Sequence, residues 1–140
     1  MTTFICRSLK DTKAAAEYFS QFAKIGQCFA LSGDLGCGKT TFSRYLIRSL
    51  NPSIRDIPSP TFSLVQTYEA EPAKILHADC YRLKSQEECY ELDLLEAIET
   101  HITIIEWPQI IEELLPADAI RIAFSMEGKK RKICTMEQII

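Results

Sequence analysis

The segment GDLGCGKTT, residues 33–41, constrains the fold of this chain more than any other stretch of its sequence. It fits the pattern G-x-x-x-x-G-K-[ST], in which glycines let successive backbone N–H groups curl around a phosphate. An apolar run at 27–31 precedes the segment, and apolar residues at helical spacing follow it over 40–51. A strand, a glycine-rich loop and a helix in this order predict a phosphate-binding loop.

The positions of this loop have separate chemical roles. Lys39 is expected to reach the β- and γ-phosphates, and the Thr40 hydroxyl is expected to bind Mg²⁺. The helix that follows adds partial positive charge at its N-terminus. The chain has no Asn-Lys-x-Asp segment of the kind that GTPases use for guanine, so we expect ATP. The expected ATP-binding residues of the loop are Gly33, Asp34, Leu35, Gly36, Cys37, Gly38, Lys39, Thr40 and Thr41.

Cys37, inside the loop, has two interpretations. A thiol near a helix N-terminus can be acidified and oxidised, which would make Cys37 a redox switch. Alternatively, its side chain points away and only its backbone binds the nucleotide.

The six cysteines include no C-x-x-C pair, which is typical of reduced cytoplasmic thiols. Because no apolar run approaches ~20 residues and the N-terminus lacks a secretion signal, we expect a cytoplasmic protein without a membrane partner.

The order of apolar patterns predicts an α/β fold. We expect helices at 11–24, 40–51, 85–99 and 109–115, strands at 27–31, 62–68, 74–79 and 102–107, and a terminal hairpin of 119–126 with 131–136. This alternation favours a P-loop NTPase-like sandwich whose sheet is largely parallel, with antiparallel additions. The chain has 140 residues and shows no linker or repeat, so residues 1–140 are expected to form a single domain.

Two carboxylates fall where open α/β sheets bind ligands, at the carboxyl ends of strands. Asp79 ends the run KILHAD, and Glu106 nearly ends ITIIEW. Either side chain could contact Mg²⁺ or its waters, or orient the attacking water. One acidic residue at a strand end could equally be a solvated loop residue or a helix cap. Two of them in a chain with a phosphate loop favour a functional role.

Three further features have both a functional and a structural interpretation. His77 and Asp79 share a strand face, but zinc needs three or four ligands and no others stand out. The only tryptophan, Trp107, could be a core residue or a site residue. The basic run at 129–132 could be a solvated hairpin tip or a contact to RNA or a partner.

The segment Ser59-Pro60-Thr61 follows the helix after the phosphate loop. Phosphate-sensing switch segments lie at this place in related architectures, and Thr61 could contact the γ-phosphate. A proline turn that leads into a strand is the alternative.

Four segments occur in a fixed order along the chain: GDLGCGKTT, SPTFSLVQTY, HADCYRL and IIEWP. Together they resemble the bacterial TsaE family, the ATPases of tRNA threonylcarbamoyladenosine synthesis. The phosphate loop alone occurs in many proteins, whereas the set of four is far more specific. The resemblance runs from about residue 11 to the final hairpin. It implies a small ATPase, weak alone, that binds a TsaB–TsaD heterodimer and resets it between turnovers, while TsaD transfers the threonylcarbamoyl group to the adenosine beside the anticodon.

The resemblance also implies roles for the catalytic residues. Lys39 and Thr40 would hold the phosphates and Mg²⁺. Glu106 would be the second Mg²⁺ contact, and Asp79 would be needed for hydrolysis.

Three other positions gain an implied role. Trp107 would lie near the nucleotide, residues 59–61 would form a switch-like loop, and Thr12 would lie where the N-terminal segment meets the nucleotide. The chain carries a net charge of −3, whereas proteins that grip RNA alone usually have a basic face. We therefore expect tRNA to be held indirectly, through the partner proteins.

Two other functions compete with a partner-dependent ATPase. A small-molecule kinase would share the phosphate loop, but it would usually need a mobile lid that carries arginines, and no insertion of that length is visible. A nucleotide-gated binding module would need no productive hydrolysis, and Asp79 and Glu106 argue against it.

Overall fold

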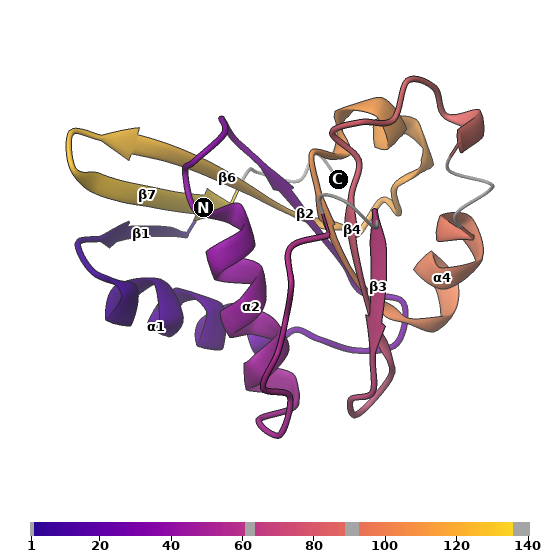
Figure 1. Ribbon diagram of the computed structural model, residues 1–140, viewed down its shortest axis with the longest axis horizontal. Coiled ribbons are helices and arrows are strands. Elements are labelled where there is room, and N and C mark those ends of the chain that lie inside the picture. Colours follow the sequence, from indigo (N-terminus) through magenta and orange to yellow (C-terminus); the bar gives the residue numbers. More distant parts are fainter. Residues whose placement is uncertain (1, 61–63, 89–92, 136–140) are drawn as a thin grey trace.

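The computed structural model describes residues 2–60, 64–88 and 93–135, where seven strands form one sheet in the order β1-β7-β6-β2-β5-β4-β3 (Figure 1). The strands are β1 (Thr3–Cys6), β2 (Cys28–Ser32), β3 (Val65–Tyr68), β4 (Ile75–Asp79), β5 (Ile102–Glu106), β6 (Ile120–Glu127) and β7 (Lys130–Thr135). The helices are α1 (Leu9–Ser20), α2 (Lys39–Leu50), α4 (Leu94–Thr100) and the 3₁₀ helix η1 (Pro108–Leu114).

The four central strands β6, β2, β5 and β4 are parallel to one another. The outer strands add antiparallel pairs: β3 pairs with β4, β7 with β6, and β1 with β7. This arrangement confirms the expected α/β sandwich. Strand β1 was not expected, because its four residues TFIC gain their order from pairing with β7, more than 120 residues later (Thr3 opposite Cys134).

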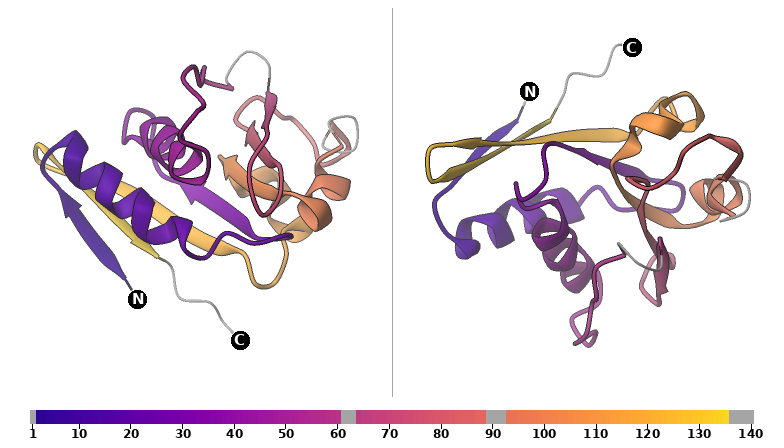
Figure 2. Two further views of the ribbon diagram at one scale, coloured as in Figure 1. Left: turned by 90° about the horizontal axis from the view of Figure 1, so that it is seen from below. Right: turned by 45° about the horizontal axis from the view of Figure 1, so that its top comes forward.

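Side chains on the central strands alternate between two apolar cores. In β2, Phe29 and Leu31 face α1 and α2, whereas Cys28 and Ala30 face α4 and η1. Strand geometry imposes this alternation, and a strand buried on both faces reads as a continuous apolar run. Figure 2 shows α1 and α2 side by side against one face of the sheet.

Helix α1 (Leu9–Ser20) begins two residues before the expected start at residue 11 and ends before the expected residue 24. Ser8 caps it by accepting a hydrogen bond from the Asp11 backbone N–H at 3.3 Å, whereas Asp11 was the expected cap. Helix α2 follows the phosphate loop directly. The rings of Phe19 in α1 and Phe42 in α2 pack with centroids 5.9 Å apart, so the two helices share one aromatic contact.

Three expected elements differ from the structure. The expected helix at 85–99 is interrupted, because Asp93 has a left-handed backbone (φ 56°) and α4 begins after it. The expected helix at 109–115 is a 3₁₀ helix that begins at Pro108. Strand β3 begins at Val65, because Leu64 has a left-handed backbone (φ 67°), and the first two residues of the expected strand at 62–68 lie outside the described residues. Among the helices described, none has both the length and the apolar character needed to cross a membrane.

Candidate functional site

The carboxyl ends of β2, β4 and β5 bring the phosphate loop together with both expected carboxylates. Glu106, the last residue of β5, lies opposite Leu31 of β2 on one side and Asp79 of β4 on the other. Parallel strands that end at one edge place their last residues in one crevice. Asp79 and Glu106 are buried and line a pocket of about 250 Å³. The loop residues that line the same pocket are Leu35, Gly36, Gly38, Lys39, Thr40 and Thr41.

The glycine positions of the loop meet real backbone demands. Gly33 has φ 141°, and a Cβ added there would lie 2.4 Å from the carbonyl oxygen of Phe124 in β6. Gly38 has φ 97° and directly precedes Lys39, the first residue of α2. L-residues rarely adopt this left-handed region, so glycine is required for the loop to close against β6 and turn into the helix.

Lys39 is folded over its own loop. Its Nζ donates hydrogen bonds to the carbonyl oxygens of Gly33 at 2.6 Å and Asp34 at 2.8 Å. The same Nζ lies 4.2 Å from the centroid of the Trp107 ring, a distance at which an ammonium is attracted by an aromatic face. The side chain of Lys39 is buried, so its charge is held at the pocket rather than in solvent.

The Glu106 carboxylate is the centre of a polar cluster. Thr40 Oγ1 donates to its Oε1 at 2.7 Å, and Ser43 Oγ lies 3.4 Å from its Oε2. The Nε2 atom of His77 lies 2.5 Å from the same Oε2. His77 is fully buried, and its Nδ1 has no hydrogen-bond partner among the described residues. These contacts hold the Glu106 carboxylate beside Thr40, the residue expected to bind Mg²⁺.

Trp107 lines the pocket. Its backbone is left-handed (φ 58°), and its N–H donates to the Leu31 carbonyl at 3.1 Å. Its ring packs on Tyr81 with centroids 4.7 Å apart. A left-handed conformation is a genuine outlier for a bulky residue, and such strain gathers at functional sites.

Asp79 lines the same pocket. Its Oδ1 accepts a hydrogen bond from the backbone N–H of Tyr81 at 2.9 Å, which fixes the carboxyl group at the end of β4. Asp79 and Glu106 therefore approach the phosphate loop from adjacent strands.

Some expected site residues lie elsewhere. Thr12 is fully buried and does not line the pocket, but its Oγ1 accepts a hydrogen bond from Nη1 of the pocket residue Arg131 at 3.1 Å. Ser59 is half-buried and Pro60 is buried, but neither lines the pocket as the described residues define it, and Thr61 lies outside the described residues. Cys37 is buried and its thiol contacts the Asp34 carbonyl, which favours the interpretation in which its backbone serves the loop.

Three residues of the site were not among those expected there: Ser43, Arg131 and, as a partner of Glu106, His77. Ser43 lies one turn after Lys39 on the buried face of α2, a position that helical spacing could have indicated. Arg131 belongs to the basic run at 129–132. Lys129 and Lys130 are exposed as a solvated hairpin tip should be, but Arg131 is half-buried and lines the pocket.

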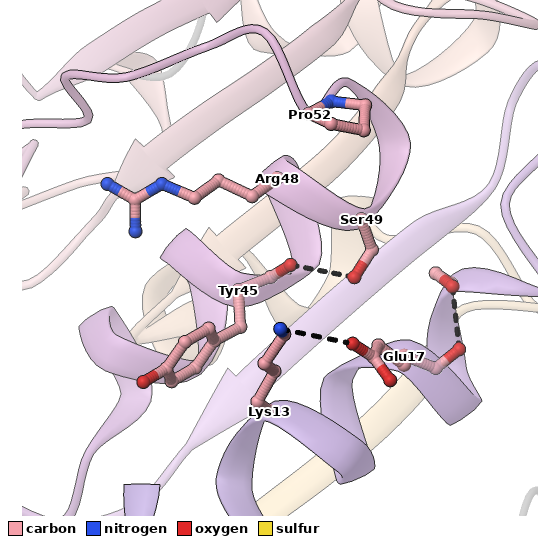
Figure 3. A pocket seen from close by; sticks show the side chains of 7 residues that line it. Lys13, Glu17, Tyr45, Arg48, Ser49 and Pro52 are labelled. Carbon is pink, nitrogen blue, oxygen red and sulfur yellow. Dashed lines mark hydrogen bonds and ion pairs between the residues drawn. The ribbon is translucent and has the colours of Figure 1, made fainter. Parts of the chain in front are cut away.

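A wider groove of about 550 Å³ lies between α1 and α2 (Figure 3). Lys13 and Glu17 point toward each other there and form an ion pair at 3.8 Å, while Arg48 extends away from them (Figure 3). Both paired side chains are more than half exposed, so the contact contributes little. The pocket at the phosphate loop is the candidate site because three buried charged side chains of the described residues, Lys39, Asp79 and Glu106, converge there.

The sequence of the chain matches a known family over most of its length. The family model described as "Threonylcarbamoyl adenosine biosynthesis protein TsaE" matches residues 6–133. The chain belongs to the TsaE family. Proteins of this family take part in tRNA threonylcarbamoyladenosine biosynthesis.

Individual TsaE proteins are similar along nearly the whole chain. One from Rickettsia bellii is 41% identical over 132 residues, which cover 94% of this chain and 92% of that protein. One from Bacillus subtilis is 33% identical over 131 residues, which cover 93% and 81%. Among solved structures, the crystal structure of YdiB from Bacillus subtilis matches with a TM-score of 0.74 at 28% identity and covers 96% of this chain and 83% of that one.

Proposed function

We propose that this TsaE-family chain binds and hydrolyses ATP, and that this cytoplasmic activity resets a TsaB–TsaD heterodimer between rounds of tRNA modification. The observation that carries the proposal is the contact of Thr40 with Glu106 at 2.7 Å above the phosphate loop. A hydroxyl and a carboxylate oxygen at this spacing are the ligand types that Mg²⁺ prefers. Bound there, Mg²⁺ would neutralise charge on the phosphates.

The other residues of the pocket suit phosphoryl transfer to water. Lys39 supplies a buried positive charge for the β- and γ-phosphates, and the N-terminus of α2 adds its backbone N–H groups. Asp79, held at the end of β4, orients the attacking water. Trp107 packs against the Lys39 ammonium at one wall of the pocket.

The acidic character of the chain fits an indirect role in tRNA modification. With a net charge of −3, the chain lacks the excess of Lys and Arg typical of proteins that hold RNA alone. Hydrolysis here acts as a timer, because the ATP-bound and ADP-bound forms differ in their affinity for the partner.

The test separates binding from hydrolysis. We expect Asp79→Ala to bind ATP within a few-fold of the unsubstituted chain while its turnover falls at least ~100-fold, the usual contribution of a group that handles the reacting proton or water. Binding is measured by calorimetry and turnover by phosphate release. Glu113→Ala, an exposed acidic position, is the control, and Lys39→Ala is the blank.

Three outcomes would contradict the proposal in different ways. Normal turnover by Asp79→Ala would remove the role assigned to Asp79. Absence of ATP binding by the unsubstituted chain would overturn the proposed function. Turnover that depends on a small-molecule acceptor rather than on water would favour a kinase.

A further inference from the structure

Arg131 reaches the phosphate loop from the opposite end of the chain. It lies on β7, which runs beside β1 in the sheet (Figure 1). A Cβ added to Gly38 would lie 2.3 Å from both Cζ and Nε of Arg131, so the guanidinium group packs directly on the loop backbone. Arg131 also lines the pocket that holds Lys39 and Glu106.

One branch of the guanidinium group is held in place by a buried hydroxyl. Nη1 of Arg131 donates to Oγ1 of Thr12 at 3.1 Å, and Thr12 is fully buried on α1. This contact joins α1, β7 and the phosphate loop. A planar guanidinium group held at one nitrogen has few ways to turn, so its remaining N–H groups keep a fixed direction.

The guanidinium group is not fully paired in the part of the chain that the structure describes. Its Nε is buried there without a hydrogen-bond partner, and no described carboxylate forms an ion pair with the side chain. A buried N–H group without an acceptor costs free energy, and a charged group costs more. A positive charge kept in this state beside an anion-binding loop calls for an anionic acceptor.

We propose that Arg131 binds the phosphate chain of the nucleotide from the Gly38 side, and that Thr12 positions it. The inference rests on the proposed ATP site. In loops of this pattern the backbone holds the α- and β-phosphates, and the lysine reaches the β- and γ-phosphates. Because Arg131 packs on the backbone of Gly38, it contacts phosphates that ATP and ADP share. It therefore retains the nucleotide through hydrolysis.

The first experiment compares affinities for ATP and ADP by calorimetry. Arg131→Gln should raise the dissociation constants of both nucleotides about tenfold or more, and by the same factor, since a charged hydrogen bond to phosphate is lost from each. Arg131→Lys should recover only part of this loss, because an ammonium cannot reproduce the planar fork. Lys132→Gln, which removes a neighbouring charge from β7, is the matched control.

Two results would overturn the assignment. In the first, Arg131→Gln weakens binding no more than Lys132→Gln does. In the second, ATP binding is weakened and ADP binding is not, which would place Arg131 at the γ-phosphate. If the unsubstituted chain binds neither nucleotide, the proposed function itself fails, so the two failures are distinguishable.

A double-mutant cycle tests the positioning role of Thr12. Thr12→Val keeps the volume of the side chain but removes the acceptor for Nη1. It should raise both dissociation constants several-fold in the unsubstituted chain and leave them unchanged when Arg131 is already Gln, because contacting residues are not additive. Full additivity would contradict the positioning role. Thermal unfolding of each variant checks that the fold is retained.

Discussion

Glu106 is the residue on which the polar contacts of the site converge. Glu106 is 2% exposed, and its carboxylate contacts Thr40, Ser43 and His77. Removal of one partner from such a group leaves a buried charge with fewer contacts, which costs more than the contact itself contributes.

We therefore expect His77→Leu to lower the free energy of unfolding by about 3 kcal/mol. Urea denaturation followed by circular dichroism measures the change. His101→Leu is the control, because His101 is half-exposed just after α4 and, among the described residues, its side chain hydrogen-bonds with its neighbour Thr100. Equal losses in the two variants would show that the contact of His77 with Glu106 does not stabilise the fold.

Cys28 gives the chain a predictable alkaline sensitivity. Burial raises the pKa of its thiol from an ordinary value of 9.0 to about 11. The unfolded chain therefore ionises this thiol at a lower pH than the folded chain. The stability from Cys28 is fully present below pH 9 and is lost as the pH rises toward 11, by up to about 3 kcal/mol.

The difference between the unsubstituted chain and Cys28→Ala isolates this effect from other groups that titrate at high pH. Unfolding free energies measured from pH 8 to pH 11 should fall more steeply in the unsubstituted chain. Parallel curves for the two proteins would mean that the Cys28 thiol titrates normally in the folded state.

At the scale of the elements, α2 connects the phosphate loop to the apolar core. Phe42, four residues after Gly38, is fully buried and its ring packs on Phe19 and on Phe124, with centroids 5.9 and 5.2 Å away. Phe124 is also the residue whose carbonyl approaches Gly33. The first turns of α2 and the start of the loop therefore share one strand, β6, as their support.

Phe42→Ala should destabilise the fold by about 4 kcal/mol, since it leaves a cavity between α1, α2 and β6. Phe22→Ala, at a position 41% exposed, should cost about 1 kcal/mol. Chemical denaturation of both variants provides the comparison. A loss at Phe42 no larger than that at Phe22 would mean that the aromatic cluster does not support α2.

The elements that the sequence predicts are those whose signal is local. Apolar runs predict β2, β4 and β5, and therefore also the positions of Asp79 and Glu106 at strand ends. Strand β1 and the inward face of Arg131 depend on pairing between the two ends of the chain, which no local pattern records. The break at Asp93 also escapes prediction, because helical spacing continues across it.

At the scale of the whole molecule, the sign of the net charge differs from the sign of two side chains that approach the phosphate loop. The chain is acidic, with a net charge of −3, yet Lys39 and Arg131 bring two positive charges to the phosphate loop, in a pocket that Asp79 and Glu106 also line. Such local concentration suits a protein that binds a small polyanion itself and leaves a large one to its partners.

The most direct test of a partner-dependent ATPase is steady-state ATP turnover with and without a purified TsaB–TsaD pair, and with the pair plus tRNA. Lys39→Ala serves as the blank in each mixture. We expect slow turnover alone and at least about a tenfold rise with the pair, because catalytic groups supplied in trans can contribute far more than this. A turnover rate unchanged by a pair that demonstrably binds the chain would contradict the proposed role.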